Sequence, residues 1–507
     1  MANLMPSSAT AGGFLLVLAI VLPVASALLS LALGGRYAER IAFIVMPAGL
    51  AVAIAILVSV WRTHNALQYF VGNWHPPLGV AFRADGLSAA MMVTAALLIG
   101  GIGLFAREPF ASAQEAEIRA PLVFWTLLLA VWGALNAVFI GGDLFNLYVA
   151  LELLTFSAVP LVSLDGRAET LAAALRYLLF ALFGSILYLL GAVLLYGAYG
   201  TLDLVLLSGR IHAEPVAWAA TSLMTAGLLA KAALYPFHLW LPPAHAGAPA
   251  PASAILSGLV VKAPFFLVVR LWFDVMPTLP EHASAQVLGI LGATAIILGS
   301  VVALRQVRLK LLIAYSTVAQ IGYLFLMFPL AVNPEAGLPW STAAWTGGIL
   351  QAISHAFAKA AMFMSAGLIA EALGHDRIAG LIGIGRALPV TVFAFGLGGL
   401  SLMGLPPSGG FVAKAMLLTA AVAAGQWWWA VVILTGGLLA GGYVFLVLAR
   451  ALAYASEPLT LLSTISPTRQ AVVVAVALCA MLLGFVPLRP FELLQIGRAD
   501  MAIGGLR

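Results

Sequence analysis

Charged residues are what this sequence has least of. Only 8% of its 507 residues are Asp, Glu, Lys or Arg, whereas soluble globular proteins carry about 25%. Hydrophobic residues make up 63% of the chain, and its mean hydropathy is +1.08. This composition excludes a soluble globular domain and predicts a polytopic membrane protein. The net charge of +5 is spread over short loops without a basic run, which argues against nucleic-acid binding.

Cysteine and the usual metal and nucleotide motifs are also scarce. The one cysteine, Cys479, excludes a disulfide or an iron–sulfur cluster held by this chain alone. His238 and His245 are separated by proline-interrupted chain without a nearby carboxylate, so they lack zinc-ligand spacing. No phosphate-binding glycine loop or nicotinamide fingerprint follows a predicted strand. We therefore expect neither a metal nor a cofactor in this chain.

Long apolar runs fill most of the sequence. About fourteen of them approach the roughly 20 residues that a helix needs to cross a bilayer. The first, Phe14–Leu33, is interpreted as a retained helix, because Met1–Gly13 lacks a basic region and a cleavage site. Helices are expected because a lipid-facing backbone must satisfy its own hydrogen bonds. The stretch His64–Arg83 alternates like strands and predicts a small β-hairpin on the outer face.

The distribution of basic residues predicts the orientation. Lys and Arg are more numerous in the loops after odd-numbered segments, where Arg469 is counted, than after even-numbered ones, where Arg270 is counted. Basic loops stay cytoplasmic, so both termini are expected outside.

Two apolar segments are broken by proline and glycine. One break is Lys231–Pro243 (KAALYPFHLWLPP) and the other is Met403–Lys414 (MGLPPSGGFVAK). Proline removes a helix donor and clashes with the preceding turn. Breaks at corresponding positions of two halves are typical of inverted-repeat transporters. The sequence therefore predicts an N-terminal part over residues 1–119, five-helix repeats over 120–273 and 283–448, and a C-terminal helix and tail over 449–507.

A series of ionisable residues lies inside these apolar segments, comprising Glu152, Lys231, Lys262, His355, Lys359 and Lys414. A charge at the bilayer centre costs roughly 2.5–3.5 kcal/mol, so such residues persist mainly where they pair or line a water-filled path. One acid followed by bases is what a proton route requires.

Each member of this series also has a structural interpretation. Glu152 has no partner on its own helix, and Lys231 is the natural candidate, either as a pair that opens and closes or as a static salt bridge. The lysines can release a proton where arginines cannot, unless they snorkel to the interface.

The histidines leave further alternatives open. His355 and Lys359 share one helix face at i and i+4. Histidine as a residue type titrates near neutral pH, so His355 is a candidate relay, or it is a packed histidine that hydrogen-bonds a carbonyl. His238 and His245 flank the first break, where they either give protons access to the surface or cap the broken helix.

Several stretches taken together resemble the antiporter-like subunits shared by respiratory complex I, membrane-bound hydrogenases and Mrp-type sodium/proton antiporters. They are GGDLFNLYVALELL (Gly141–Leu154), KAALYPFHLWLPPAHAGAPAPASAILSGLVVK (Lys231–Lys262), LKLLIAYSTVAQIGY (Leu309–Tyr323), ISHAFAKAAMFMSAG (Ile353–Gly367) and LSLMGLPPSGGFVAK (Leu400–Lys414). The GDLFNL run and the predicted hairpin are most similar to the D-type members of the Mrp group. One departure is Pro243, where many relatives carry Asp.

The resemblance implies a fourteen-helix fold with two inverted five-helix repeats. It also implies a proton path through a glutamate–lysine pair, a central lysine, a histidine and a terminal lysine, which fall on Glu152, Lys231, Lys262, His355 and Lys414.

On these grounds the sequence predicts a proton-translocating subunit of a multi-subunit Na⁺/H⁺ antiporter, without a redox site of its own, in a bacterial plasma membrane. Its expected partners are other membrane subunits, protons, Na⁺ and the bilayer. The first alternative is a pump module of a complex I-like NADH:quinone oxidoreductase or a hydrogenase. The second is a scaffold subunit that does not conduct.

Overall fold

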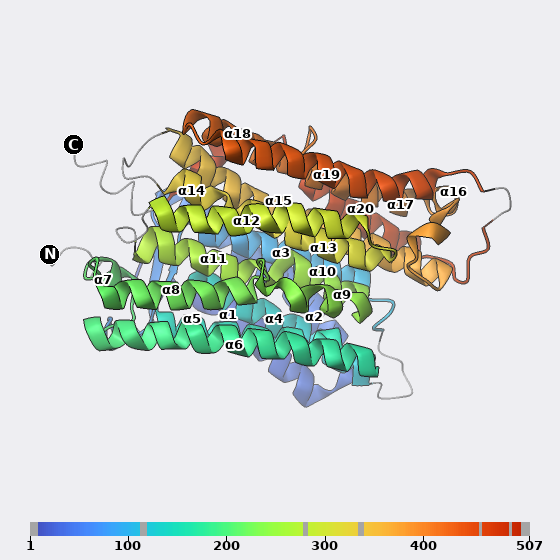
Figure 1. The fold of residues 1–507 in the computed structure, drawn as a ribbon. Helices are drawn as coiled ribbons and strands as arrows, with labels where there is room; N and C mark the ends of the chain where they lie inside the picture. Colours follow the sequence, from blue (N-terminus) through green and yellow to red (C-terminus); the bar gives the residue numbers. More distant parts are fainter. Residues whose placement is uncertain are drawn as a thin grey trace.

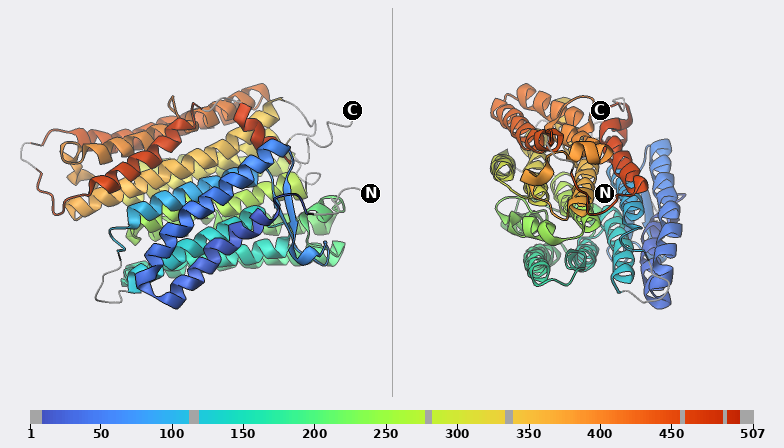
Figure 2. Two further views of the ribbon diagram at one scale, coloured as in Figure 1. Left: turned by 180° about the vertical axis from the view of Figure 1, so that it is seen from behind. Right: turned by 90° about the vertical axis from the view of Figure 1, so that its right-hand side faces the viewer.

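Long helices running side by side make up almost the whole molecule (Figure 1). The computed structural model describes residues 9–111, 119–276, 282–332, 339–455, 459–485 and 489–497. Seen end-on, the first helices, coloured blue, form one flank of the bundle (Figure 2). The helix α9 lies at one end of the bundle, and α7 lies at the other (Figure 1).

The α-helices are α1 (Phe14–Leu33), α2 (Gly35–Thr63), α3 (Gly86–Ala106), α4 (Arg119–Ile140), α5 (Leu144–Val162), α6 (Ala168–Tyr199), α7 (Leu204–Ser208), α8 (Pro215–Lys231), α9 (Leu241–Gly247), α10 (Ala250–Ile255), α11 (Lys262–Arg270), α12 (His282–Leu304), α13 (Leu309–Phe325), α14 (Met327–Ala331), α15 (Pro339–Leu373), α16 (Ile384–Ala387), α17 (Pro389–Met403), α18 (Gly409–Ala423), α19 (Trp427–Leu452) and α20 (Pro467–Leu482). Short 3-10 helices are η1 (Val71–Asn73), η2 (Phe237–Trp240), η5 (Ile378–Leu381) and η6 (Arg489–Gln495), and π-helical turns are η3 (Leu256–Val260) and η4 (Leu271–Val275).

The chain is an integral membrane protein. Within the described residues, eleven helical segments are long and apolar enough to cross a bilayer, and three shorter apolar helices, α17, α18 and α20, accompany them. The span Ala250–Val275, made of α10, η3, α11 and η4, is buried except at Ala250, Arg270 and Asp274, which are partly exposed. By contrast, α6 exposes Leu175, Leu179 and Ile186 on its outer side, as a lipid-facing helix does.

Short polar side chains set where several helices begin. The Asp85 carboxylate accepts a hydrogen bond from the Ser88 backbone N–H at 2.9 Å and caps α3. Asp143 caps α5 in the same way, and the Ser408 hydroxyl caps α18. Such residues satisfy backbone donors that the first helical turn leaves free. Each helix therefore starts where its sequence supplies an acceptor.

Two short strands pair antiparallel between α2 and α3. In β1 (Leu67–Phe70) and β2 (Ala81–Ala84), Leu67 lies opposite Ala84 and Phe70 opposite Ala81. The strands match the stretch His64–Arg83 that alternates in the sequence, except that β2 extends one residue further, and β2 leads directly into the cap of α3. The Arg83 guanidinium, at the end of β2, donates to the Gly497 carbonyl at 2.9 Å and so ties the hairpin to the end of the described chain.

Several basic residues that the sequence analysis counted in loops lie within helix bounds. Two of them, Arg270 and Arg469, form ion pairs inside the bundle, so their assignment to loops was wrong. Arg270 belongs to α11, where its guanidinium contacts Asp85 at 2.5 and 2.6 Å and Asp274 at 2.6 Å. Arg469 belongs to α20 and lies 2.9 Å from Glu371. A carboxylate partner reduces the cost of burying a guanidinium, so these charges need not lie in loops.

Both proline-containing breaks interrupt helices. The helix α8 ends at Lys231, and η2 and α9 follow before α10 resumes. Likewise, α17 ends at Met403 and α18 begins at Gly409, because Pro406 and Pro407 cannot continue the hydrogen-bonding pattern. A lysine therefore lies next to each break, with Lys231 before the first and Lys414 after the second.

Candidate functional site

Glu152 of α5 and Lys231 of α8 form an ion pair. The Lys231 ammonium lies 2.9 Å from the Glu152 carboxylate and also donates to the Thr155 hydroxyl at 3.0 Å. The Ser185 hydroxyl donates to the same carboxylate oxygen of Glu152. The two charged side chains are 5% and 14% exposed, so the pair is largely shielded from solvent. Lys231, the partner proposed for Glu152 from the sequence, is therefore the residue that contacts it in the structure.

Close packing of α6 on α8 brings these groups together. Gly184 of α6 and Gly227 of α8 face each other, and a Cβ added to Gly184 would lie 2.5 Å from the Gly227 carbonyl oxygen. Small residues let two membrane helices approach at backbone distance. Ser185 follows Gly184, and Lys231 lies one turn after Gly227. The glycine contact therefore fixes the depth at which the lysine meets Glu152.

Lys262 is fully buried at the first position of α11. Its ammonium donates to the Ser257 carbonyl, which belongs to the π-helical turn η3. Such turns inside α-helices widen the backbone and are frequent at functional sites. The Ser257 hydroxyl in turn lies 3.0 Å from the Thr317 hydroxyl of α13. All of these partners are neutral.

Lys359, near the middle of α15, is fully buried as well. Its ammonium donates to the Ile313 carbonyl at 3.0 Å and to the Ser316 hydroxyl, both on α13. Within the described residues, no carboxylate forms an ion pair with it. Its charge is therefore stabilised by dipoles alone.

Lys414 of α18 reaches back across the second break. Its ammonium donates to the Leu402 carbonyl of α17 at 2.5 Å and lies 4.0 Å from the centre of the Tyr323 ring. Cations are attracted to the faces of aromatic rings, which partly replaces hydration. The Gln320 amide donates to the same Leu402 carbonyl at 3.1 Å. The end of α17 thus joins Lys414 to a buried polar group on α13.

His355 lies one turn before Lys359 on α15 and is buried. It is within electrostatic reach of Lys262, Lys359 and Lys414. Neither of its ring nitrogens has a hydrogen-bond partner among the described residues. The alternative of a packed histidine that donates to a carbonyl is therefore not what the structure shows. His355 is thus a buried imidazole that all three lysines influence electrostatically.

The two histidines of the first break differ from each other. His238 is half-buried and stacks on Tyr235 with 5.5 Å between ring centres. His245 is fully buried against the Phe363 ring at 4.5 Å, within electrostatic reach of Lys359 and Lys262. Its two ring nitrogens have no partner in the described part of the chain, so it does not cap a helix.

Several polar residues that line this region were missed by the sequence analysis. The Gln351 amide donates to the Gln320 amide oxygen at 3.0 Å, and the Ser354 and Ser401 hydroxyls lie 2.8 Å apart. On α13, Ser316, Thr317 and Gln320 share one buried face. The spacing i, i+1 and i+4 of these polar residues in an otherwise apolar helix was a signal in the sequence. It indicates a polar face inside the bundle, because buried polar groups need partners.

The predicted residues fall into two groups. Glu152 and Lys231 form the first, and the second consists of Lys262, His355, Lys359 and Lys414, with His245 beside it. No hydrogen bond or ion pair joins Lys231 to Lys262 among the described residues. Within that same part of the chain, no three His, Cys, Asp or Glu side chains are grouped as a metal site would require.

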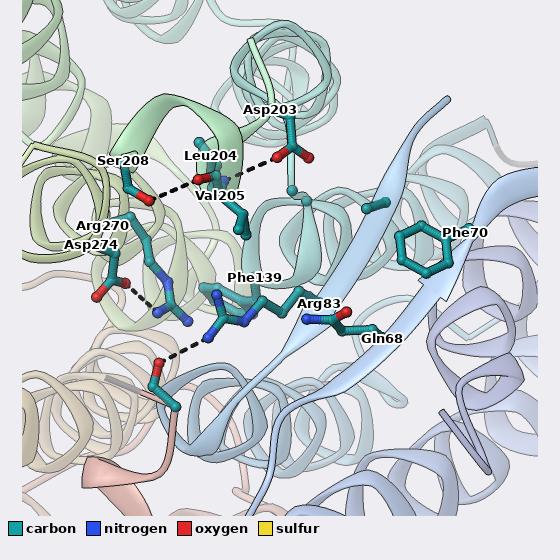
Figure 3. Close-up of a pocket in the computed structure, with 14 residues that line it drawn as sticks. Gln68, Phe70, Arg83, Phe139, Asp203, Leu204, Val205, Ser208, Arg270 and Asp274 are labelled. Carbon is teal, nitrogen blue, oxygen red and sulfur yellow. Dashed lines mark hydrogen bonds and ion pairs between the residues drawn. The ribbon is translucent and has the colours of Figure 1, made fainter. Parts of the chain in front are cut away.

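A further charged cluster lies at the end of the bundle where the hairpin is. Arg270 bridges Asp85 and Asp274. Arg270 and Asp274 line a cavity of about 120 Å³ together with the hairpin and α7 (Figure 3). Burial alone raises the pKa of the Asp85 carboxyl, but the Arg270 guanidinium outweighs it and lowers the pKa to about 2. Burial raises the pKa of Asp203, which lines the same cavity.

Comparison with known proteins places this arrangement in a family. Residues 141–440, which contain every ionisable residue of the two groups, match the family described as NADH:quinone oxidoreductase/Mrp antiporter, transmembrane. The chain belongs to this family.

Individual members of the NADH:quinone oxidoreductase/Mrp antiporter family show the same relationship. The chain is 33% identical to the N subunit of an NADH-quinone oxidoreductase from Desulforudis audaxviator, with 80% of each chain covered. It is 28% identical to the D subunit of a Na(+)/H(+) antiporter from Alkalihalophilus pseudofirmus, with 73% of each covered. The predicted resemblance to antiporter-like subunits is thereby confirmed.

Solved structures agree at the level of the fold. A chain of the Mrp complex from Dietzia sp. superposes with a TM-score of 0.84 at 24% identity, covering 95% of this chain and 96% of that one. A chain of respiratory complex I from Thermus thermophilus gives a TM-score of 0.73 at 26% identity, covering 94% and 98%. The helical architecture is thus that of antiporter-like subunits in both kinds of complex.

Proposed function

We propose that this antiporter-family member moves protons across a bacterial plasma membrane as one subunit of a multi-subunit Na⁺/H⁺ antiporter. The observation that carries the proposal is the set of buried lysines Lys262, Lys359 and Lys414. Their ammonium groups have carbonyl, hydroxyl and aromatic partners, and no carboxylate pairs with them among the described residues. Buried charges without counter-ions are rare in structural roles. Lysine, unlike arginine, can lose such a charge by releasing its proton.

The Glu152–Lys231 pair supplies the switch in this proposal. When the pair is closed, the carboxylate compensates the ammonium of Lys231. When it opens, the uncompensated charge repels a proton held farther along, toward Lys262, because electrostatic forces act strongly in a low-dielectric interior. Lys262, Lys359, His355 and Lys414 then form the route, with hydroxyl and amide groups of α13 beside it. His238 and His245 would serve access from the first break.

The arrangement in the membrane belongs to the same proposal. We infer fourteen spans. Three lie in residues 1–119, ten in two inverted five-helix repeats over 120–273 and 283–448, and one in residues 449–507. The helix breaks beside Lys231 and Lys414 support this, since they mirror each other along the chain. The loops rich in arginine would face the cytoplasm, which leaves the hairpin and both termini outside.

Membership in a larger assembly completes the proposal. The Na(+)/H(+) antiporter relative and the superposed chain of an Mrp complex support membrane subunits as partners. The second candidate is a pump module in a redox-driven complex, which the 33% identity to an NADH-quinone oxidoreductase relative favours. Neighbouring genes separate the two, because small antiporter subunits accompany the first and quinone- or iron–sulfur-binding subunits the second.

The ion pair provides the decisive experiment. We expect Glu152→Ala and Lys231→Ala each to abolish proton transport by the whole complex in vesicles, while the protein stays in the membrane and assembles. Transport is measured as a cation-dependent pH gradient at matched protein levels. A matched control is Glu169→Ala, which removes a carboxylate from the first turn of α6. Normal transport in either pair variant would refute the proposal, and loss of both variants from the membrane would favour a static salt bridge.

A further inference from the structure

A second cavity, of about 260 Å³, lies at the opposite end of the bundle from the hairpin. It opens where the ends of α6 and α9 lie side by side (Figure 1). Three arginines line it, namely Arg167, Arg176 and Arg308, together with one carboxylate among the described lining residues, Glu169. This cavity takes no part in the proton route described above.

Two of the three guanidinium groups are anchored. Arg167 pairs with Asp165 and donates to the Gly247 carbonyl at 3.3 Å. Arg308 lies 2.9 Å from Asp376 and donates to the Ala246 carbonyl at 3.2 Å. Both arginines thus hold the C-terminal end of α9 and present their remaining N–H groups at the cavity. Their side chains are nevertheless 65% and 43% exposed, so both charges remain accessible from the cavity.

Arg176 is different. It lies on α6, is exposed, and has no hydrogen bond or ion pair among the described residues. Lys310 adds a further positive charge nearby, where its ammonium donates to the Ala248 carbonyl at 3.1 Å. Arg167, Arg176, Arg308 and Lys310 outnumber Asp165, Glu169 and Asp376. The cavity therefore has an excess of donors and of positive charge, as a phosphate requires.

Arg176 lies beside exposed apolar side chains that suit the acyl chains of a lipid. On the outer side of α6, Leu175 and Leu179 flank it in sequence and are 57% and 59% exposed. A phosphate held at the arginines would have apolar chain-binding surface directly beside it. The loops at this end are the basic ones, and the cytoplasmic leaflet carries the anionic lipids that basic pockets between helices bind.

We propose that this cavity binds the phosphate headgroup of an anionic phospholipid, with Arg176 as the main ligand and the acyl chains along the exposed face of α6. The bound headgroup would join α6 to α9, the short helix that carries His245. This proposal does not depend on proton transport. It rests on the cavity, its charges and the exposed leucines of α6, and its choice of leaflet rests on the orientation proposed above.

The test uses the full-length protein, purified in detergent and delipidated, with native mass spectrometry to count bound lipid. The probes are phosphatidylglycerol, phosphatidylcholine and inorganic phosphate. We expect wild type to retain phosphatidylglycerol in preference to phosphatidylcholine. Arg176→Gln should bind it about tenfold more weakly, the loss expected for one charge-assisted hydrogen bond.

Two further variants test whether weaker lipid binding is specific to this cavity. Pro243→Asp places a carboxylate on the cavity wall without removing a basic residue, and aspartate is favourable in the first turn of α9. It should weaken phosphatidylglycerol binding as Arg176→Gln does. The control is Arg450→Gln, which removes an exposed arginine from the last turn of α19, outside the cavity. It should bind like wild type.

Several results would overturn the proposal. Equal retention of phosphatidylcholine would mean that the headgroup charge is not recognised. Unchanged binding in Arg176→Gln, or the same loss in Arg450→Gln, would place the lipid elsewhere. If inorganic phosphate alone raises the melting temperature of the protein as much as phosphatidylglycerol does, and Arg176→Gln removes both effects, the ligand is a soluble anion and the lipid assignment is wrong.

Discussion

Lysine and arginine are used differently inside this bundle. The buried arginines Arg270 and Arg469 each contact a carboxylate, so their charges are fixed and compensated. Lys262, Lys359 and Lys414 contact neutral groups instead. Only lysine among these side chains can release its proton. The arginines therefore carry permanent charges, whereas the charges of the lysines can be lost and regained.

This division leads to a prediction at Lys414. Lys414→Arg keeps a positive charge beside the Leu402 carbonyl but cannot release a proton in the working pH range. We expect the variant to assemble and yet to transport as poorly as Lys414→Ala. The measurement is pH-gradient formation in vesicles at matched protein levels. Wild-type activity in the arginine variant would mean that Lys414 supplies only fixed charge and that the proton leaves by another route.

Individual residues also show what could be foreseen from the sequence. The positions of Glu152, Lys231 and the later lysines were predictable because charges stand out in apolar segments. The partners of the later lysines, Ser257, Ser316 and Leu402, were not predictable, because the sequence of one segment does not show which part of another segment it contacts. Arg270 was misassigned for the same reason, since its partner Asp85 lies 185 residues away in the chain.

At the scale of helices, the contact between α6 and α8 holds the ion pair in place. A Cβ at Gly184 would lie 2.5 Å from a backbone oxygen of α8, and backbone cannot move aside as a flexible side chain can. We expect Gly184→Ala to force the helices apart, to destabilise the protein by about 1–3 kcal/mol, and to reduce transport by separating Lys231 from Glu152.

The control for Gly184→Ala lies on the same helix. A Cβ at Gly197 meets nothing within 4 Å, so Gly197→Ala should leave melting temperature and transport unchanged or slightly raise stability. Thermal unfolding in detergent and vesicle transport are measured side by side. Equal behaviour of the two variants would show that the close approach of α6 and α8 is not needed.

The stabilisation from the Asp85–Arg270 ion pair between α3 and α11 should depend on pH in a defined direction. Burial raises the pKa of the Asp85 carboxyl, but the Arg270 guanidinium outweighs this effect. The folded-state pKa of Asp85 is therefore lowered from 3.8 to about 2. A lowered carboxyl pKa stabilises the fold above the unfolded-state value, by about 2 kcal/mol for this shift, and this contribution is lost as pH falls toward 2.

Asp85→Asn tests this contribution. The variant should melt at a lower temperature than wild type, with a constant difference from pH 8 to about pH 5 and a shrinking one below about pH 4. Melting curves in detergent at several pH values provide the measurement. A difference that grows as pH falls would contradict the assignment of a charged Asp85 in the folded protein.

The elements themselves followed from the sequence to different degrees. Apolar length predicted the long helices well, since a spanning backbone has few alternatives to a helix. Proline and glycine predicted where α8 and α17 stop. The π-helical turns η3 and η4 on either side of α11 were not predictable, because a single π-helical turn leaves no clear mark on hydrophobic periodicity.

At the scale of the whole molecule, we predict that exchange of a second ion needs partner subunits. Within the described residues, no group of acidic, histidine or cysteine side chains is arranged to hold a metal ion. We therefore expect the purified single chain in liposomes not to exchange Na⁺ for protons, whereas the complete complex does. Sodium-dependent proton flux from the chain alone, at a rate near that of the complex, would refute this prediction.

The length of α15 has a mechanical consequence. Its 35 residues span about 52 Å at 1.5 Å per residue, against a hydrocarbon thickness of about 30 Å. A helix longer than the hydrocarbon thickness adapts to a thicker or thinner membrane by changing its tilt. Tilting moves the ends of the helix farther than its centre. The midpoint of Pro339–Leu373 falls at residue 356, between His355 and Lys359. These two residues therefore sit at a pivot, and they keep their depth whether the surrounding membrane is thick or thin.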